Sequence, residues 1–259
     1  MAWNVFTESN RCPICGKARC SISPDNAVVF CWRQEAGSFQ EAKGGYLHRI
    51  KGESTDWTPP PFVAKPKKQK AGPDVLDAVY RAFLKMLEIS PEHRSQLKSD
   101  KRQFTDEQID RRGYRTLPPT GRASICKKLL QNFDQEVLLS VPGFFISKKG
   151  RNGDYLTVSG KVGLLCPFKN KDGKIVGLQI RPDEQGESKY VWLSCSKHHM
   201  GGVGIGGDGG LPAHVSRPAE LRDSRIYITE GPIKADIASD IFGAVVIAIP
   251  GISTWESAG

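Results

Sequence analysis

The chain has 259 residues, enough for one large domain or two smaller ones that each bury a core. Charged residues make up 25% and apolar residues 39%, which excludes a wholly disordered chain, and no apolar run reaches the roughly 20 residues of a membrane span. Lysine and arginine exceed aspartate and glutamate by 37 − 28 = 9, which indicates a polyanionic partner, nucleic acid before membrane. The N-terminus shows no secretory signal pattern, so we expect a cytoplasmic protein.

Four of the seven cysteines lie close together near the N-terminus, at Cys12, Cys15, Cys20 and Cys31. The odd total and the missing signal favour a metal site over disulfides. Zn²⁺ takes four thiolates at tetrahedral angles, and the Cys-Pro-Ile-Cys-Gly turn supplies two of them. Four cysteines leave no open coordination position, so the spacing predicts a structural zinc site, with His48 as an alternative for one ligand.

Basic and aromatic side chains surround this cluster. Lys17, Arg19 and Arg33 stand near Phe30 and Trp32 in the sequence. Cations beside aromatic rings suit single-stranded nucleic acid, which offers phosphates and unstacked bases. The alternative is that Trp32 packs into a small core.

Composition divides the chain into four parts. Residues 55–73 hold five prolines and four lysines, a pattern typical of a semi-rigid linker whose lysines are either solvated or in contact with phosphate. The predicted parts are a zinc-ribbon module at 1–50, a linker at 51–73, a basic part at 74–222 (helical over 74–135, strand-rich over 138–222) and a further unit at 223–259.

The helical part begins with an amphipathic pattern over residues 73–90. Ser90-Pro91 predicts the start of a second helix, Thr105 with Gln108 forms a capping box that opens a third, and Gly113 ends it. A last helix is predicted over 122–133. The apolar face of the first helix is Val75, Leu76, Val79, Tyr80, Phe83 and Leu84. The basic residues expected on solvated faces are Arg94, Lys98, Lys101, Arg102, Arg111 and Arg112.

Short apolar segments separated by turn signals follow residue 138 and predict strands. Asn170 to Gly173 is typical of a hairpin turn. Residues 201–210 contain seven glycines and form either a phosphate-binding loop or, as we favour because no Lys-Ser/Thr and no clear helix follow, a flexible loop. The predicted strands are VPGFFISKK, DYLTVSG, VGLLCPFKN, KIVGLQIRP and KYVWLSC.

The segment from Arg225 predicts a strand, a helix and a second apolar strand, which indicates a parallel sheet. Glu230-Gly231 falls where the first strand ends and the helix begins, at the sheet edge where ligands bind in open α/β folds. There a carboxylate can hold a divalent metal or simply stabilise the helix dipole. Two parallel strands leave a sheet largely uncovered, so we expect the chain to be a fragment.

These motifs resemble those of bacterial-type DNA primases. IYITEGPIKADIA resembles the first motif of the TOPRIM domain, which primases share with type IA and II topoisomerases and some nucleases. KIVGLQIRPDEQGESKYVWLSCS is similar to the basic motif of the primase polymerase domain. CPICGKARC, CWRQEAGSFQEAKGGYLHRI and PGISTW resemble segments of primase-like proteins of phages and mobile elements. The order of the three motifs is that of primases and not of topoisomerases.

The resemblance implies an α+β fold: a zinc ribbon, a basic mixed α/β polymerase-type subdomain and the start of a parallel α/β TOPRIM domain. It places the catalytic, Mg²⁺- or Mn²⁺-binding glutamate at Glu230 and the basic polymerase residues at Arg181 and Lys189. The implied activity is primer synthesis on single-stranded DNA during replication of a phage or mobile element. The implied partners are template, nucleotides and a replicative helicase, in a bacterial cell or a phage-infected host.

Nucleotidyl transfer needs a metal held by carboxylates and cations that neutralise charge at the phosphorus. Arg181 and Lys189 supply cations, unless they form a hairpin ion pair with Asp183 or Glu187. The Asp-x-Asp motif that TOPRIM domains carry on a later strand does not occur here, and Asp236 and Asp240 lie on the helix. We therefore expect this chain to bind nucleic acid without polymerising. One alternative is a non-catalytic zinc-dependent replication protein that binds single-stranded nucleic acid. The other is a TOPRIM nuclease, and the basic motif favours polymerisation over that cleavage activity.

Overall fold

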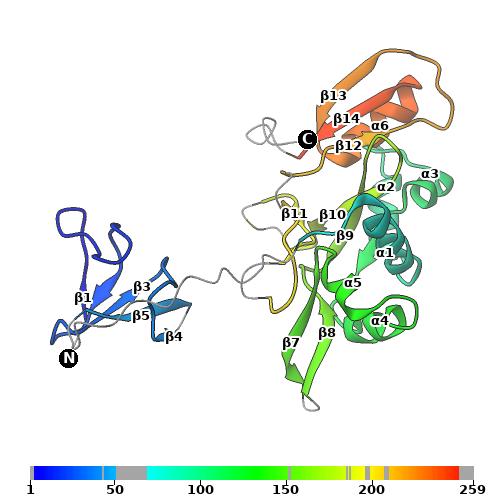
Figure 1. Ribbon diagram of the computed structural model, residues 1–259. Coiled ribbons are helices and arrows are strands. Elements are labelled where there is room, and N and C mark those ends of the chain that lie inside the picture. The colour runs from blue at the N-terminus through cyan, green and yellow to red at the C-terminus, as the bar shows by residue number, and fades with distance from the viewer. Residues whose placement is uncertain are drawn as a thin grey trace. The chain divides into compact units, whose positions relative to one another are not determined.

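The computed structural model describes residues 3–42, 44–50, 69–150, 153–184, 186, 188–195, 199–206 and 210–250. Most of the predicted linker, Glu187 and the part of the PGISTW segment after Pro250 lie outside these residues. The chain divides into two compact units, residues 1–67 and 68–259, each with secondary structure of its own (Figure 1). The mixed α+β class expected from the sequence is confirmed. Within the described residues, none of the helices combines the length and apolarity needed to cross a bilayer.

The N-terminal unit is an antiparallel sheet with the strand order β1-β2-β3-β5-β4. Its core consists of Phe6 and Val29 together with three buried cysteines, which is too few apolar side chains to hold such a unit without further bonds. Gly45 approaches the Phe30 ring so closely that a Cβ there would overlap it. The strands are β1 Asn4–Val5, β2 Ser21–Ile22, β3 Val28–Cys31, β4 Gln40–Ala42 and β5 Gly45–Arg49.

The helices of the second unit begin and end largely where their capping residues predict. Ser90 accepts a hydrogen bond from the His93 N–H, Thr105 and Gln108 form the capping box, and Gly113 ends its helix with φ +82°. Val75, expected on the buried face of the first helix, is 38% exposed, because the buried stripe runs from Leu76 to Leu84. The helices are α1 Pro73–Lys85, α2 Pro91–Lys98, α3 Asp106–Arg112, α4 Arg122–Leu129, α5 Gln135–Leu139 and α6 Pro232–Phe242.

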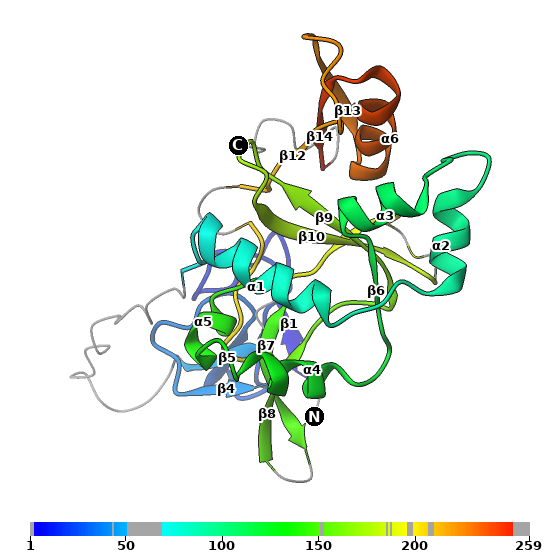
Figure 2. The ribbon, with the colours of Figure 1, turned by 90° about the vertical axis from the view of Figure 1, so that its right-hand side faces the viewer.

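A four-stranded antiparallel sheet, ordered β11-β10-β9-β6, forms the centre of this unit. Helix α1 packs against β10, and α4 packs against the β7–β8 hairpin. That hairpin lies at one end of the unit and α6 with its strands at the other (Figures 1 and 2). The strands are β6 Arg115–Leu117, β7 Phe144–Gly150, β8 Gly153–Val158, β9 Gly163–Lys169, β10 Ile175–Pro182 and β11 Val191–Trp192.

The turn predicted between β9 and β10 is present. The Asn170 side chain accepts hydrogen bonds from the N–H groups of Asp172 and Lys174, and Gly173 takes φ +76°. Of the glycine-rich stretch, residues 201–206 are described, and there Val203 and Ile205 are buried. Strand β6 and helix α5 were not predicted, because their three and five residues carry too little periodicity.

The predicted strand–helix–strand segment forms as β13 Ile226–Glu230, α6 and β14 Val245–Ile249, with the two strands parallel in register. A third strand, β12 His214–Ser216, pairs antiparallel with β14 and lies before residue 223 in the sequence. The sheet is therefore ordered β12-β14-β13, with β13 at its edge. The strands are not buried on both faces, since Ile226 and Ile228 are 64% and 72% exposed.

Candidate zinc centre and anion pocket

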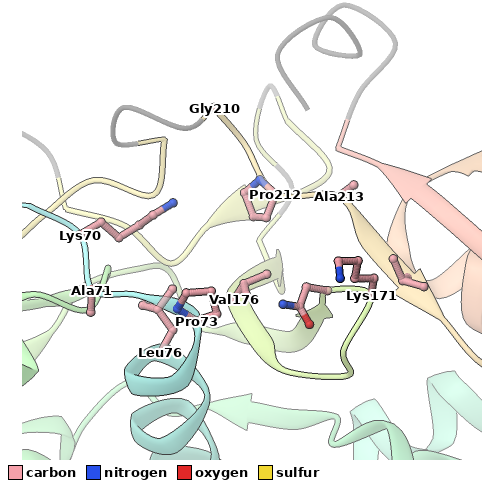
Figure 3. A pocket seen from close by; sticks show the side chains of 11 residues that line it. Lys70, Ala71, Pro73, Leu76, Lys171, Val176, Gly210, Pro212 and Ala213 are labelled. Carbon is pink, nitrogen blue, oxygen red and sulfur yellow. The ribbon is translucent and has the colours of Figure 1, made fainter. Parts of the chain in front are cut away.

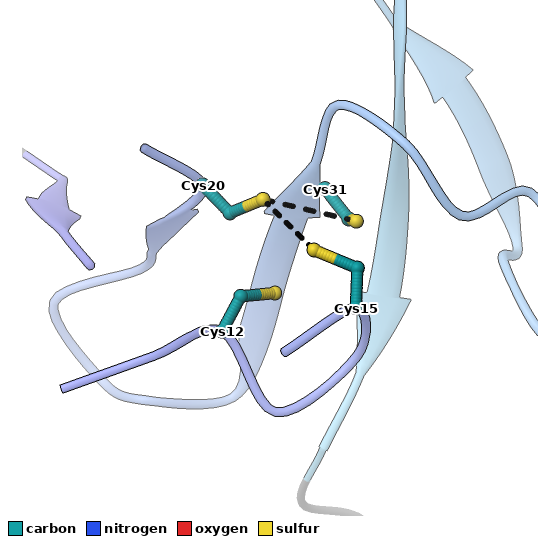
Figure 4. Close-up of side chains that lie close together, drawn as sticks. All are labelled: Cys12, Cys15, Cys20 and Cys31. Atoms are coloured by element: carbon teal, nitrogen blue, oxygen red, sulfur yellow. Dashed lines mark hydrogen bonds between the residues drawn. The ribbon is translucent and has the colours of Figure 1, made fainter. Parts of the chain in front are cut away.

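The four N-terminal cysteines converge on one point (Figure 4), where their Sγ atoms all lie within 4.8 Å of one another. Cys15 and Cys20 are separated by 3.6 Å and Cys20 and Cys31 by 3.8 Å between sulfurs. A tetrahedral Zn²⁺ with Zn–S bonds of about 2.3 Å requires sulfur separations of roughly 3.8 Å. The donor set and its spacing fit a structural zinc ion.

Two local structures deliver these thiols. Cys12 and Cys15 share a tight turn, in which the Gly16 N–H donates to the Cys12 carbonyl at 2.8 Å and Gly16 takes φ +68°. Cys20 precedes β2 and Cys31 ends β3, so the pairing of these strands brings the second two thiols together. The four cysteines thus lie at the centre of the unit, whose core has few apolar side chains besides them.

The thiols differ in their tendency to ionise. Burial raises the pKa of Cys20 to about 12. Burial also acts against ionisation of Cys15, but the backbone N–H of Lys17 and the neighbouring thiols outweigh it and lower the pKa of Cys15 to about 7. The Arg33 guanidinium lies 3.7 Å from the Cys20 sulfur and donates to the Ala18 carbonyl, so its charge faces the thiols.

The remaining residues proposed around the cluster take different positions. The His48 ring is buried with Nε2 2.7 Å from the Gln34 carbonyl oxygen, and it is not part of the sulfur cluster. Trp32 is 46% exposed, donates its indole N–H to the Arg19 carbonyl and meets the Phe30 ring edge to face. The exposed part of the Trp32 ring is accessible to a nucleobase. The side chains of Lys17 and Arg19 are exposed.

A polar cavity of about 360 Å³ in the second unit brings Arg181 and Lys189 together. It opens where β10 ends, and helix α2 forms its opposite wall. No hydrogen bond or ion pair joins either cation to another described residue, and Nη1 of Arg181 is buried without a partner among them. The lining residues are His93, Gln96, Arg181, Pro182, Asp183, Gly186, Ser188 and Lys189.

Asp183, expected as the ion-pair partner of Arg181 or Lys189, pairs elsewhere. Its Oδ1 lies 2.8 Å from Nε2 of His93, a buried residue of α2 that was not predicted as a site residue. A buried guanidinium nitrogen without a partner costs about 1–3 kcal/mol. Phosphate oxygens accept charge-assisted hydrogen bonds from guanidinium and ammonium groups, so Arg181 and Lys189 give this cavity donors that suit an anion.

Glu230 lies apart from this arrangement. It ends β13 opposite Ile249, its side chain is exposed, and Gly231 follows with φ +83° before α6 begins. Glu230 does not line the 360 Å³ cavity, and no cluster of three metal-ligating residues among the described ones includes it. A single carboxylate does not make a Mg²⁺ site, because Mg²⁺ keeps its waters unless several oxygen ligands compete.

The carboxylates nearest in sequence are occupied by arginine. Arg112, expected on a solvated face, is buried and places Nη1 2.7 Å from Asp236 and Nη2 2.7 Å from Asp240. Arg111 binds the same oxygen of Asp240 at 2.6 Å. Lys98 is exposed as expected and Arg94 is half-buried, and both pair with the exposed Asp106.

Asp236 has three further partners: His214 Nε2 at 3.0 Å, the Ser216 hydroxyl at 2.7 Å and the Tyr114 hydroxyl at 2.6 Å. Burial alone opposes its ionisation, but His214 and Arg112 outweigh burial and hold the pKa of Asp236 well below its usual range. We name Arg111, Arg112, Tyr114, His214, Ser216, Asp236 and Asp240 the interior network. It joins α3 to α6 and β12, and neither aspartate is available to a metal.

A second cavity, of about 420 Å³, lies beside the start of α1 (Figure 3). Lys70 there donates to the Ile205 carbonyl at 2.8 Å, and burial lowers its pKa. Lys171 pairs with Asp172 at 3.4 Å. Both cations are thus engaged, whereas Arg181 has no partner for its Nη1 atom in the part of the chain that the structure describes. The apolar lining consists of Ala71, Pro73, Leu76, Val176, Pro212, Ala213 and Val215.

No family model matches the chain, and no curated protein matches it. Solved structures with a similar arrangement include the RNA polymerase domain of Mycobacterium tuberculosis primase DnaG with double-stranded DNA bearing a 6-nucleotide overhang (21% identity, TM-score 0.46, 71% of this chain, 56% of that chain).

The zinc-binding and RNA polymerase domains of Aquifex aeolicus primase are also similar (14% identity, TM-score 0.46, 69% of this chain, 43% of that chain). The E. coli primase catalytic core is a third (15% identity, TM-score 0.44, 72% of this chain, 59% of that chain). The chain spans about half the length of these structures.

Proposed function

We propose that this chain is the zinc-binding and polymerase-type part of a DNA primase that engages single-stranded DNA and nucleotides. Two features support the proposal: the motif resemblance, in which a cysteine module precedes the basic motif and Glu-Gly, and a geometry that places the two cations of the basic motif in one polar cavity. The proposal extends to a phage or mobile element as source, to a replicative helicase as partner and to the cytoplasm as location.

One observation carries the proposal: Arg181 and Lys189 line the same polar cavity, and Arg181 has a buried nitrogen without a partner among the described residues. The ion pair with Asp183 that would have explained Arg181 structurally does not form, since Asp183 binds His93. Cations kept unpaired in a cavity suit a polyanionic ligand, because every phosphate oxygen can accept a hydrogen bond from them.

The test is fluorescence anisotropy with a labelled 16-nucleotide oligo(dT). Arg181→Gln and Lys189→Gln should each weaken binding roughly tenfold, the loss of one charge-assisted hydrogen bond. Lys85→Gln is the matched control, because Lys85 is exposed on α1 and does not line the cavity. Equal losses in all three variants would show that only net charge matters, and the cavity would then have no role.

A specific observation favours a second candidate, a zinc-dependent single-stranded-DNA-binding replication protein without catalysis. Asp236 and Asp240 bind arginines of α3. Among the described residues, Glu230 belongs to no cluster of carboxylates or other groups that could hold a metal ion. In this alternative the interior network has replaced a metal site, and the chain keeps only the ability to bind.

Primer synthesis with template, nucleoside triphosphates and Mg²⁺ tests whether this chain is catalytic by itself. We expect this chain to bind oligo(dT) and to form no primers, because one carboxylate does not hold the metal that nucleotidyl transfer requires. Template-dependent product that disappears in Glu230→Gln would instead support catalysis at Glu230. Failure to bind oligo(dT) at low salt would contradict both candidates.

A further inference from the structure

Three side chains form a hydrogen-bonded chain at the anion pocket: Thr116, and His93 and Asp183, which line it. Thr116 Oγ1 accepts the Ser90 N–H at 2.8 Å, so the Thr116 hydroxyl hydrogen is free to point to His93 Nδ1, 2.7 Å away. The second ring nitrogen of His93 then carries its hydrogen and donates it to Asp183 Oδ1 at 2.8 Å. The hydrogen-bond network therefore directs an N–H of His93 at Asp183.

His93 is a rigid donor. Its side chain is buried, and its backbone N–H is held by the capping hydroxyl of Ser90 at 3.2 Å. The same helix is anchored by Leu97, which is fully buried in the core under α2 and α3. A side chain fixed by packing and by hydrogen bonds at both ring nitrogens loses little entropy when it holds a carboxylate.

Arg181 and Asp183 are two residues apart where β10 ends, and both line the cavity. Residues i and i+2 of an extended chain share a face with Cα atoms about 7 Å apart, within reach of an arginine side chain. Asp183 is half exposed, so its carboxylate is able to turn if nothing holds it. Turned toward Arg181, it would neutralise the cation and repel an incoming phosphate.

We propose that His93 is a positioning residue of the anion pocket: it holds Asp183 away from Arg181, so that Arg181 stays unpaired and binds a phosphate group. This inference rests on the proposed function, because it assumes that Arg181 binds a phosphate of DNA or of a nucleotide. In this proposal His93 acts through the conformation of Asp183 and not as a ligand of the phosphate.

The test is a double-mutant cycle between His93 and Asp183, with two probes, inorganic tripolyphosphate by calorimetry and labelled 16-nucleotide oligo(dT) by anisotropy. His93→Ala should weaken binding about tenfold, because Asp183 then competes for Arg181. Asp183→Asn should raise the affinity for the probes about tenfold in the His93→Ala background but at most about threefold in the wild-type background. His93→Gln, which keeps an N–H donor, should stay within about threefold of wild type.

The outcomes distinguish a failure of the role proposed for His93 from a failure of the proposed function. Equal gains from Asp183→Asn in both backgrounds would overturn the role of His93, since simple charge removal would explain them. If Arg181→Gln binds both probes as wild type does, the proposed function fails instead. A coupling seen only with tripolyphosphate assigns the pocket to nucleotides, and one seen with both probes includes the DNA backbone. If His93→Ala does not fold, the cycle is repeated with His93→Met, which fills the space without donating.

Discussion

Arg112→Met tests whether the interior network holds the second unit together. The Arg112 side chain is 5% exposed and bridges Asp236 and Asp240, whose side chains are 4% and 9% exposed. Methionine has a similar length and no charge, so the substitution removes the cation while largely preserving packing. Removing one partner of a buried ion pair typically costs 3–5 kcal/mol, because the remaining charge stays desolvated and uncompensated.

The structure places this substitution at the lower end of that range, about 3 kcal/mol. Asp236 keeps hydrogen bonds from Tyr114, His214 and Ser216, and Asp240 keeps Arg111. In urea, with a slope of about 2 kcal/mol per molar, the midpoint should fall by roughly 1.5 M. Far-UV circular dichroism of the zinc-loaded chain in increasing urea measures this midpoint.

Arg111→Met is the matched control, since the Arg111 side chain is 33% exposed and contacts only Asp240 of the two aspartates. It should cost under about 1 kcal/mol. Arg112→Met combined with Asp236→Asn should unfold less readily than Arg112→Met alone, because no unpaired charge remains at Asp236. A midpoint for Arg112→Met within about 0.2 M of the wild type would refute the reasoning.

Elemental analysis should find one zinc per chain. Cys15→Ser should lose this zinc and unfold residues 10–35, since structural zinc contributes on the order of 10 kcal/mol in small modules; an ordered N-terminal unit after chelation would contradict this. A Cβ at Gly163 would overlap the backbone of β10, so Gly163→Ala should cost about 1–3 kcal/mol in urea, whereas Gly206→Ala, with open space around it, should be neutral. The depressed pKa of Asp236 means that its ionised form stabilises the fold above about pH 4 and that this contribution is lost as pH falls below that value. Asp236→Asn should therefore flatten the acid limb of the stability curve, and an unchanged limb would show that other carboxylates control acid unfolding.

Local signals in the sequence predicted the elements that have strong local causes. The capping box at Thr105, the Ser90-Pro91 start and the Asn170 turn all form because the required side-chain to backbone bonds lie within four residues. The parallel pairing of β13 and β14 followed from their apolar composition. The four cysteines could be grouped because four soft ligands at close spacing in the sequence favour a metal site.

The long-range polar contacts could not be predicted in the same way. Arg112 lies in a run of basic residues whose default position is solvent, and its burial depends on Asp236, 124 residues further on. His93 and Asp183 are 90 residues apart, and neither carries a local signal for the other. Strand β12 has three residues, too few for a period, and forms only because β14 offers an edge. Pairing of polar groups is set by the tertiary fold.

The same pairing limits which basic residues can act on DNA. Of the 37 lysines and arginines, Arg94, Lys98, Arg111 and Arg112 are bound to aspartates. The cations proposed to reach phosphates are Arg181, Lys189, Lys17 and Arg19.

Each phosphate neutralised on a single strand contributes about −0.7 to the slope of log K against log salt. The expected slope therefore lies between about −1.4 for the pocket alone and about −2.8 with the zinc unit included, and Arg181→Gln should reduce its magnitude by about 0.7. Anisotropy titrations of oligo(dT) at a series of salt concentrations measure it. A slope near −6, the value for nine phosphates, would mean that the whole charge excess binds DNA without regard to the pocket, and the arrangement around Arg181 would then not determine recognition.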